Sequence, residues 1–488
     1  MKRTLIIFSS TLLLLSGCVS LSEKEQRAHL MQPSSLQESV QDSLASGYFQ
    51  EGAWPDKEWW QTFSSDELNA LMAETLQANP TLLSVKYRVE QARQETKIAK
   101  APLFPFLFFD YSENWGYLSQ NGLYRALNPD VPLNGNLLDL SLAFTYEFDF
   151  WGKNANLFHA ALGREKAETA EDSEATLLIS TAVAQAFFAL KVQLGKKELL
   201  TSLLEVKQDI YDLQRLLRDH ALSSELIPLF GDEEVLEIKK QVIGIEEEIA
   251  VTKHQINALA GRSPDTSIPI RSSLPLFPEK IALPTNLSID LLARRPDLMA
   301  QIWRVEALAH EVGAAKADFY PNINLTALAG LEAFGFANLF KGSSKTGSLQ
   351  PAIHLPIFTA GSIKANVRAK KAAFDAAVYE YNNQLLQAAK EVADLLVMTR
   401  AVHEKKQQQE QIIESAAKRL DITAINLSKG LDNQIQVYMR KQEVLVKKLQ
   451  LLDLVYTQFA LYIRLMKAMG GGYESPYHLP LQAEEGSS

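Results

Sequence analysis

The chain has 488 residues and a formal net charge of −9, with 47% hydrophobic and 22% charged residues. The acidic charge argues against a nucleic-acid partner, because neutralising phosphates requires a basic surface. The single cysteine excludes intrachain disulfides and zinc sites built from several cysteines. The longest apolar run, residues 5–15, is shorter than the ~20 residues of a membrane helix, so the composition also argues against a polytopic helical membrane protein.

The N-terminus has the layout of an export signal. Lys2 and Arg3 precede the apolar run, and the small residues Ser16 and Gly17 follow it directly before Cys18. Leu15 to Cys18 resembles a bacterial lipobox, which implies that residues 1–17 are a signal peptide, that Cys18 carries a covalent lipid, and that 18–55 form an acylated linker. Val19 after the cysteine favours the outer membrane by the same analogy. An ordinary signal with a chance cysteine is the alternative.

The rest of the chain contains an internal repeat. Pro80 aligns with Pro296 at an offset of 216 residues, and Gly261 aligns with Gly470 at an offset of 209 residues. The repeat divides the chain into a first unit at 56–261, a linker at 262–285, a second unit at 286–472 and a tail at 473–488.

Each unit predicts the same order of elements: a helix, two strands and a long helical hairpin. Period-two alternation marks the strands, and the length between breakers marks the helices. The predicted elements are a helix at about 65–103, strands at 106–115 and 138–150, a helix at 153–219, a turn at 219–224 and a return helix at 229–260, then strands at 323–329 and 349–357 and a turn at 429–433.

Four strands per chain are too few for a closed barrel, since about eight are needed to fill its interior. An open sheet would leave two strand edges unpaired. A barrel shared between chains removes both edges, with alternate residues facing lipid and lumen. The sequence therefore predicts an assembly that encloses a conduit.

Several motifs in order resemble TolC/OprM-type outer-membrane factors, the outer-membrane efflux family. They are residues 146–153 (YEFDFWGK), 292–298 (LARRPDL), 313–321 (GAAKADFYP) and 470–473 (GGGY). The resemblance implies a mixed α and β membrane protein in the outer membrane of a Gram-negative bacterium. Three chains would form a twelve-stranded transmembrane β-barrel and a long α-helical barrel across the periplasm.

The same resemblance implies a function. The homotrimer would be a passive duct that exports small toxic compounds or drugs, together with a periplasmic adaptor and an inner-membrane pump of the RND type. The duct would sit in outer-membrane lipid, with no enzymatic activity and no cofactor besides the lipid on Cys18.

The family closes its duct at the periplasmic helix tips, with aspartates shortly after a turn glycine that corresponds to Gly430. The positions six and nine residues later are Gln436 and Met439, so the acidic ring of the family is not matched here. Asp432, Gln436 and Met439 are aperture candidates by position, and ordinary solvated or packed helix residues are the alternative.

Two other functions compete with drug efflux. A protein-secretion duct that works with an ABC transporter would have the same architecture. A periplasmic coiled-coil scaffold lipoprotein would use the helices without a pore, but it has no need of four alternating strands. Arg294, Arg295 and Asp297 are expected to fix a helix start at Pro296, since an acidic side chain favours the positive end of the helix dipole.

Overall fold

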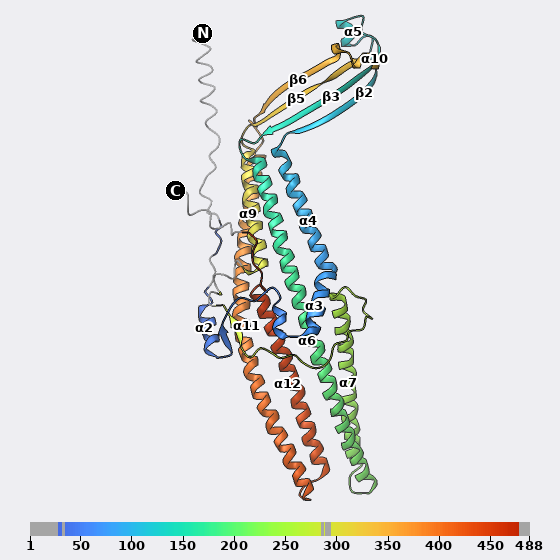
Figure 1. Ribbon diagram of the computed structural model, residues 1–488, viewed down its shortest axis with the longest axis vertical. Coiled ribbons are helices and arrows are strands. Elements are labelled where there is room, and N and C mark those ends of the chain that lie inside the picture. Colours follow the sequence, from blue (N-terminus) through green and yellow to red (C-terminus); the bar gives the residue numbers. More distant parts are fainter. Residues whose placement is uncertain (1–27, 32–34, 285–286, 288–293, 478–488) are drawn as a thin grey trace.

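The computed structural model describes residues 28–31, 35–284, 287 and 294–477. The predicted signal peptide, Cys18 and the end of the tail lie outside the described residues. Figure 1 shows a long molecule with a sheet of strands at one end, long helices through its middle, and two helical hairpin tips at the other end.

The elements of the first half follow the predicted order. They are α2 (Gln37–Ala45), β1 (Phe49–Glu51), the 3-10 turn Trp59–Phe63, α3 (Asp66–Ala78), α4 (Pro80–Lys100), β2 (Phe106–Tyr117), α5 (Leu123–Leu127), β3 (Asn134–Phe148), α6 (Lys153–Asp219) and α7 (Leu226–Leu259). The two predicted strands of this half and the long helix at 153–219 are confirmed.

The second half repeats this order. It contains β4 (Ile281–Leu283), α9 (Pro296–Ala317), β5 (Asn322–Phe334), α10 (Phe336–Leu339), β6 (Lys345–His354), α11 (Ser362–Ser428) and α12 (Gln434–Ala468). β1 and β4 pair in parallel beside the helices. The helix start at Pro296 is confirmed.

Two predicted boundaries are wrong. The helix expected at 65–103 is broken into α3 and α4 at Asn79, whose extended backbone ends one helix while its side chain accepts the N–H groups of Thr81 and Leu82 in the next. The strand expected to reach residue 357 ends at His354, two residues before Pro356, which cannot donate to a strand ladder.

The large sheet is antiparallel, in the order β2-β3-β5-β6. Leu140 of β3 stands opposite Tyr111 of β2 and Leu331 of β5, and Ile323 of β5 stands opposite Ile353 of β6. The central pair, β3 with β5, joins one strand from each half of the chain. The two halves therefore form one continuous sheet.

The helices form a layer below the sheet. Near the sheet the neighbours are α4, α6, α9 and α11 in that order, and toward the tips they are α7, α6, α12 and α11. Only α6 and α11 among these helices have 67 residues, so these two run from the sheet to the tips. The helices α7 and α12 end at one level of the molecule, beside α3 and the start of α9. We call this level the waist.

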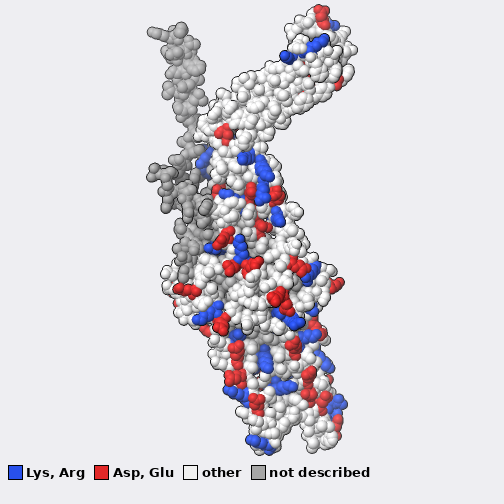
Figure 2. All heavy atoms as spheres, in the orientation of Figure 1, with Lys and Arg blue, Asp and Glu red and all other residues white. Residues whose placement is uncertain are grey.

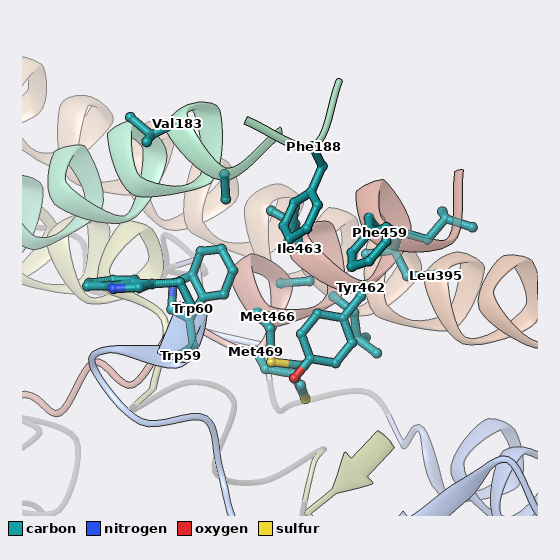
Figure 3. Packing of buried hydrophobic residues seen from close by; sticks show 14 of the residues in the cluster. Trp59, Trp60, Val183, Phe188, Leu395, Phe459, Tyr462, Ile463, Met466 and Met469 are labelled. Atoms are coloured by element: carbon teal, nitrogen blue, oxygen red, sulfur yellow. The ribbon is translucent and has the colours of Figure 1, made fainter. Parts of the chain in front are cut away.

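An aromatic core fills the waist. Phe188 of α6 stacks on Phe459 of α12 with ring centroids 4.0 Å apart, and Phe63 meets Phe188 edge-on at 4.7 Å. Tyr462, Met466 and the adjacent Trp59 and Trp60 close the cluster (Figure 3). Large buried rings of this kind contribute strongly to a core's stability, so this cluster holds the helices together at the waist.

One described helix, α6, contains a window long and apolar enough to cross a membrane by length and composition, and 61% of that window is buried within the protein. Its small and apolar side chains pack against the neighbouring helices. Gly163 shows how closely, since a Cβ there would lie 3.1 Å from the carbonyl oxygen of Trp303 in α9.

Candidate channel-forming surfaces

The register of the sheet separates its side chains into two faces, because directly opposed residues of antiparallel strands point the same way. One face is apolar over most of its length. It is formed by Leu107, Phe109, Tyr111, Leu138, Leu140, Leu142, Phe144, Ile323, Leu325, Ala327, Ala329, Leu349 and Ile353. Each strand has 10 to 15 residues, and about 10 residues of a tilted strand span a bilayer.

The other face holds most of the polar side chains, including Ser112, Thr145, Asn324, Thr326 and Gln350. It also carries four carboxylates, those of Asp110, Asp139, Glu147 and Glu332. Among the described strand residues of this face there is no Lys or Arg. Asp139 and Glu332 stand directly opposite one another. This face therefore has a negative potential.

Aromatic side chains gather at both ends of the sheet. At the loop end they include Trp115, Tyr117, Tyr124, Phe336 and Phe340, all exposed. At the helix end Trp151 stacks on Tyr320 at 4.7 Å, and its indole N–H donates to the carbonyl of Pro321 at 2.8 Å. Two aromatic girdles that flank an apolar band are typical of transmembrane β-barrels.

Both the sheet and the helix layer have open edges. β2 and β6 are the outer strands, so each has one edge with no strand partner within the described chain. On one side of the helix layer the outer helices expose apolar residues: Tyr87 and Ile98 on α4 near the sheet, and Leu229, Leu236 and Ile243, every seventh residue, on α7 toward the tips (Figure 1). Such unpartnered apolar stripes mark surfaces that another chain can cover.

One face of the helix layer below the sheet carries a ladder of ion pairs. Glu311 of α9 binds Arg164 of α6 and Lys370 of α11, and the Lys370 nitrogen lies 2.7 Å from its oxygen. Burial tends to raise the pKa of Glu311, but hydrogen bonds and charge from Lys370 and Arg164 outweigh it and lower the pKa. In Figure 2 charged side chains are frequent on the helices and sparse on the visible face of the sheet.

The predicted aperture residues lie at the turn between α11 and α12 and in the first two turns of α12. Asp432 is in the turn and accepts the N–H of Asn433, and Asn433 in turn caps α12 by accepting the N–H of Gln436 at 3.0 Å. Gln436 is half-buried and Met439 is exposed. The structure places the three near the tip, and their role as an aperture stays a prediction.

A buried charge cluster at the waist was missed by the sequence reasoning, which assigned Arg295 and Asp297 only to a helix start. Arg295 donates to Asp297 at 2.7 Å, to Glu391 of α11 at 3.1 Å and to the carbonyl of Ala468, the last residue of α12, at 3.2 Å. The Asp297 carboxylate also accepts the N–H of Leu298. Arg295 is 7% exposed.

The electrostatics of this cluster follow from burial and pairing. Burial opposes the charge of Arg295, yet its two carboxylate partners raise its pKa, and Arg295 in turn holds the pKa of Asp297 below the ordinary value against burial. Glu174 of α6 adds a third carboxylate. Burial and then the charge of Asp297 raise the pKa of Glu174 to about 7. No local motif marks Glu174 in the sequence.

Comparison with known proteins agrees with this geometry. The family model described as outer membrane efflux protein matches residues 71–261 and 287–471. The chain is 27% identical over 478 residues to the multidrug resistance outer membrane protein MdtP of Escherichia coli, which covers 96% of each chain.

Two solved structures are similar over most of the chain. The outer membrane protein VceC from Vibrio cholerae is 30% identical, with a TM-score of 0.78 over 86% of this chain and 100% of that one. The CmeC outer membrane channel of Campylobacter jejuni has a TM-score of 0.81 and 22% identity, and covers 88% of this chain and 91% of that one.

Proposed function

Since the chain belongs to the outer membrane efflux protein family, we propose that three copies of it close into a passive duct that exports small toxic compounds across the outer membrane. The observation that carries this proposal is the four-stranded sheet with one apolar face, one polar face and two open edges. Three such sheets would supply twelve strands, enough for a barrel with a polar interior.

The order of the outer elements supports a closed ring. A short 3-10 turn at Ala101–Leu103 connects α4 to β2, and a short loop connects β6 to α11. One side of the chain therefore presents α4 with β2, and the other side presents α11 with β6. A single rotation that brings these two sides together would complete the strand ladder and cover the apolar stripes of the helices. Ring closure of this head-to-tail kind is how heterologous interfaces avoid open polymers.

The proposed assembly would act as a passive channel that encloses the path of its cargo. Its polar, acidic interior would let hydrated solutes pass, and its apolar exterior would hold the barrel in outer-membrane lipid. We propose that it takes its cargo from an inner-membrane pump of the RND type through a periplasmic adaptor, and the similarity to an outer membrane protein named for multidrug resistance supports a role in drug export. Its only added group would be the lipid, and the cluster at Asp432, Gln436 and Met439 would line the periplasmic aperture.

The N-terminal segment supports an acylated Cys18. The Ala28 N–H donates to Asp375 of α11, and the Met31 N–H donates to Asn382, so the chain runs along α11 toward the sheet as it approaches its N-terminus. Asp375 lies 13 residues, or ~20 Å, below the start of α11. The ten residues from Cys18 to Ala28 can span up to ~35 Å, enough to reach the lipid level.

The internal repeat belongs to the same proposal. The order helix, strand, strand, 67-residue helix and return helix occurs in both halves, as a duplicated unit requires. Two units of two strands give each chain four, and three chains then give twelve.

A direct test isolates outer membranes and resolves their proteins by gel electrophoresis with and without heating. The duct predicts a band at the trimer mass that resists detergent and shifts to the monomer on heating. A chain that salt releases as a monomer would refute the duct and favour a peripheral scaffold.

A further inference from the structure

The polar face of the sheet contains one apolar patch near the helix end. Residues 106, 108 and 110 of β2 point to this face, because alternate residues of a strand share a face. Phe106 and Phe108 are 41% and 51% exposed, and their rings stack with centroids 6.1 Å apart and planes 13° apart. Two large rings exposed side by side on a polar surface mark a place that can hold an apolar partner.

The register extends this patch over the two neighbouring strands. Phe108 stands opposite Ala143 of β3, and Ala143 stands opposite Leu328 of β5. We call Phe106, Phe108, Ala143 and Leu328 together the Phe patch. On β3 the next residues of this face on either side of Ala143 are polar, Ser141 and Thr145. The small side chain of Ala143 leaves room for a flat molecule beside the two rings.

In the proposed ring, the neighbouring chain would leave the two rings uncovered. β2 is an outer strand and would pair with β6 of the next copy. On the polar face β6 carries only small or polar side chains, those of Thr346, Ser348, Gln350, Ala352 and His354. Packing between the chains therefore does not account for Phe106 and Phe108, and their position on the polar face also separates them from the lipid.

Negative charge borders the Phe patch at both ends. Asp110 lies on its loop side, is exposed, and forms no ion pair with any described residue. Glu147 lies on its helix side, two residues beyond Thr145 on β3. Lys153, at the start of α6, is paired with Asp318 at 2.8 Å. The faces of aromatic rings are also electronegative, so the rings and the carboxylates attract the same kind of solute, a cation.

We propose that the Phe patch is a binding subsite for flat aromatic cations, which stack on Phe106 and Phe108 and place their positive charge near Asp110. The inference rests on the proposed function, because closure of three chains puts three such subsites inside the barrel. Phe106 is the first residue of β2, so cargo would meet the subsites as it passes from the helices into the barrel. Weak binding at several sites favours entry and still permits release.

Binding of propidium, a water-soluble phenanthridinium dication, tests this. The full-length protein is placed in phosphatidylcholine nanodiscs, and the anisotropy of propidium fluorescence is read against empty nanodiscs. Phe106→Ala with Phe108→Ala should raise the dissociation constant about tenfold, because both ring contacts are lost. Phe334→Ala is the matched control. It removes an exposed ring of the same face at the far end of β5 and should change the constant less than about twofold.

A second pair of variants tests the charge. Asp110→Asn should raise the dissociation constant about threefold, since an exposed carboxylate attracts a cation only modestly. Glu332→Gln removes the same charge from the same face, two strands away from β2, and should have a smaller effect. Pyrene-1-sulfonate, a fluorescent aromatic anion, should bind more weakly than propidium.

Several outcomes would overturn the subsite: no saturable binding of propidium to wild type, an unchanged constant in the double phenylalanine variant, equal weakening by Phe334→Ala, or equally tight binding of the anion. Because Phe106 and Phe108 are exposed, their loss should leave the fold intact, and thermal melts check this. Native mass spectrometry of the same samples reports the trimer. A monomer would refute the duct, whereas a trimer without ring-dependent binding would refute the subsite alone.

Discussion

A pair of adjacent lysine substitutions tests which face of the sheet meets lipid. Thr326 and Ala327 lie near the middle of β5, the strand between β3 and β6. Ala327 stands opposite Phe144 and Leu349 on the apolar face, and Thr326 stands opposite Thr145 and Gln350 on the polar face. A lysine charge on the lipid face near the bilayer centre costs roughly 2–4 kcal/mol, and one in the lumen costs little.

We therefore expect Ala327→Lys to destabilise the barrel by about 2 kcal/mol, the lower end of that range, because the long side chain can reach toward the headgroups. Thr326→Lys should change stability by less than about 1 kcal/mol, since it enters a face with four carboxylates. Urea unfolding from lipid vesicles measures both. If Thr326→Lys were as damaging as Ala327→Lys, or more so, the assignment of the two faces would be wrong.

Four further outcomes follow from particular residues. Gly470→Ala should lower the free energy of unfolding by at least about 3 kcal/mol, because its Cβ would meet a backbone carbonyl. Gly430→Ala, also at positive φ but in open space, should lower it by about 1 kcal/mol. Thermal melts of the two variants compare these losses. Asp139→Asn should lower the cation preference of single channels, read from reversal potentials across a salt gradient, without loss of stability, because it faces another carboxylate. Cys18→Ser should abolish acylation, seen by mass spectrometry, and keep the trimer in the membrane; a soluble variant would contradict the barrel. Because the pKa of Glu174 is raised in the folded chain, the folded chain keeps a proton that the unfolded chain releases above pH ~4.5. The stability of wild type should therefore fall by about 2–3 kcal/mol, relative to Glu174→Gln, as the pH rises from ~4.5 to ~7. Denaturant titrations at both ends of this pH range measure the difference.

Much of the fold could be predicted from the sequence because its signals are local. The alternation from Leu138 to Phe148 follows from the two-residue period of a strand and identifies both faces before any partner is known. The absence of proline between Gly152 and the following turn predicts the helix from Lys153 to Asp219. These patterns depend on neighbours within the segment itself.

The errors arose where a residue acts through distant partners. Asn79 looked like one position in a continuous helix, but its side chain binds a carbonyl 180 residues away and ends α3. Glu174 belongs to no local motif, and its raised pKa comes from burial and from the charge of Asp297 on α9, a distant part of the sequence. The repeat alignment places Asn79 opposite Arg295, and that comparison is the signal that could identify both contacts with the ends of the returning helices.

The level at which the returning helices α7 and α12 end has a mechanical consequence. α6 and α11 run without a break from the sheet to the tips, whereas α7 and α12 end at the waist. A barrel of paired strands resists radial change because each strand is hydrogen-bonded on both sides, so movement in the proposed duct falls to the hairpins below the waist. There, a hairpin can tilt only by bending its long helix and shifting the end of its returning helix. The contacts of Asn79 with Leu259 and of Arg295 with Ala468 lie at those two ends. The two contacts differ in charge, since the Asn79 side chain is neutral and Arg295 is paired with Asp297 and Glu391.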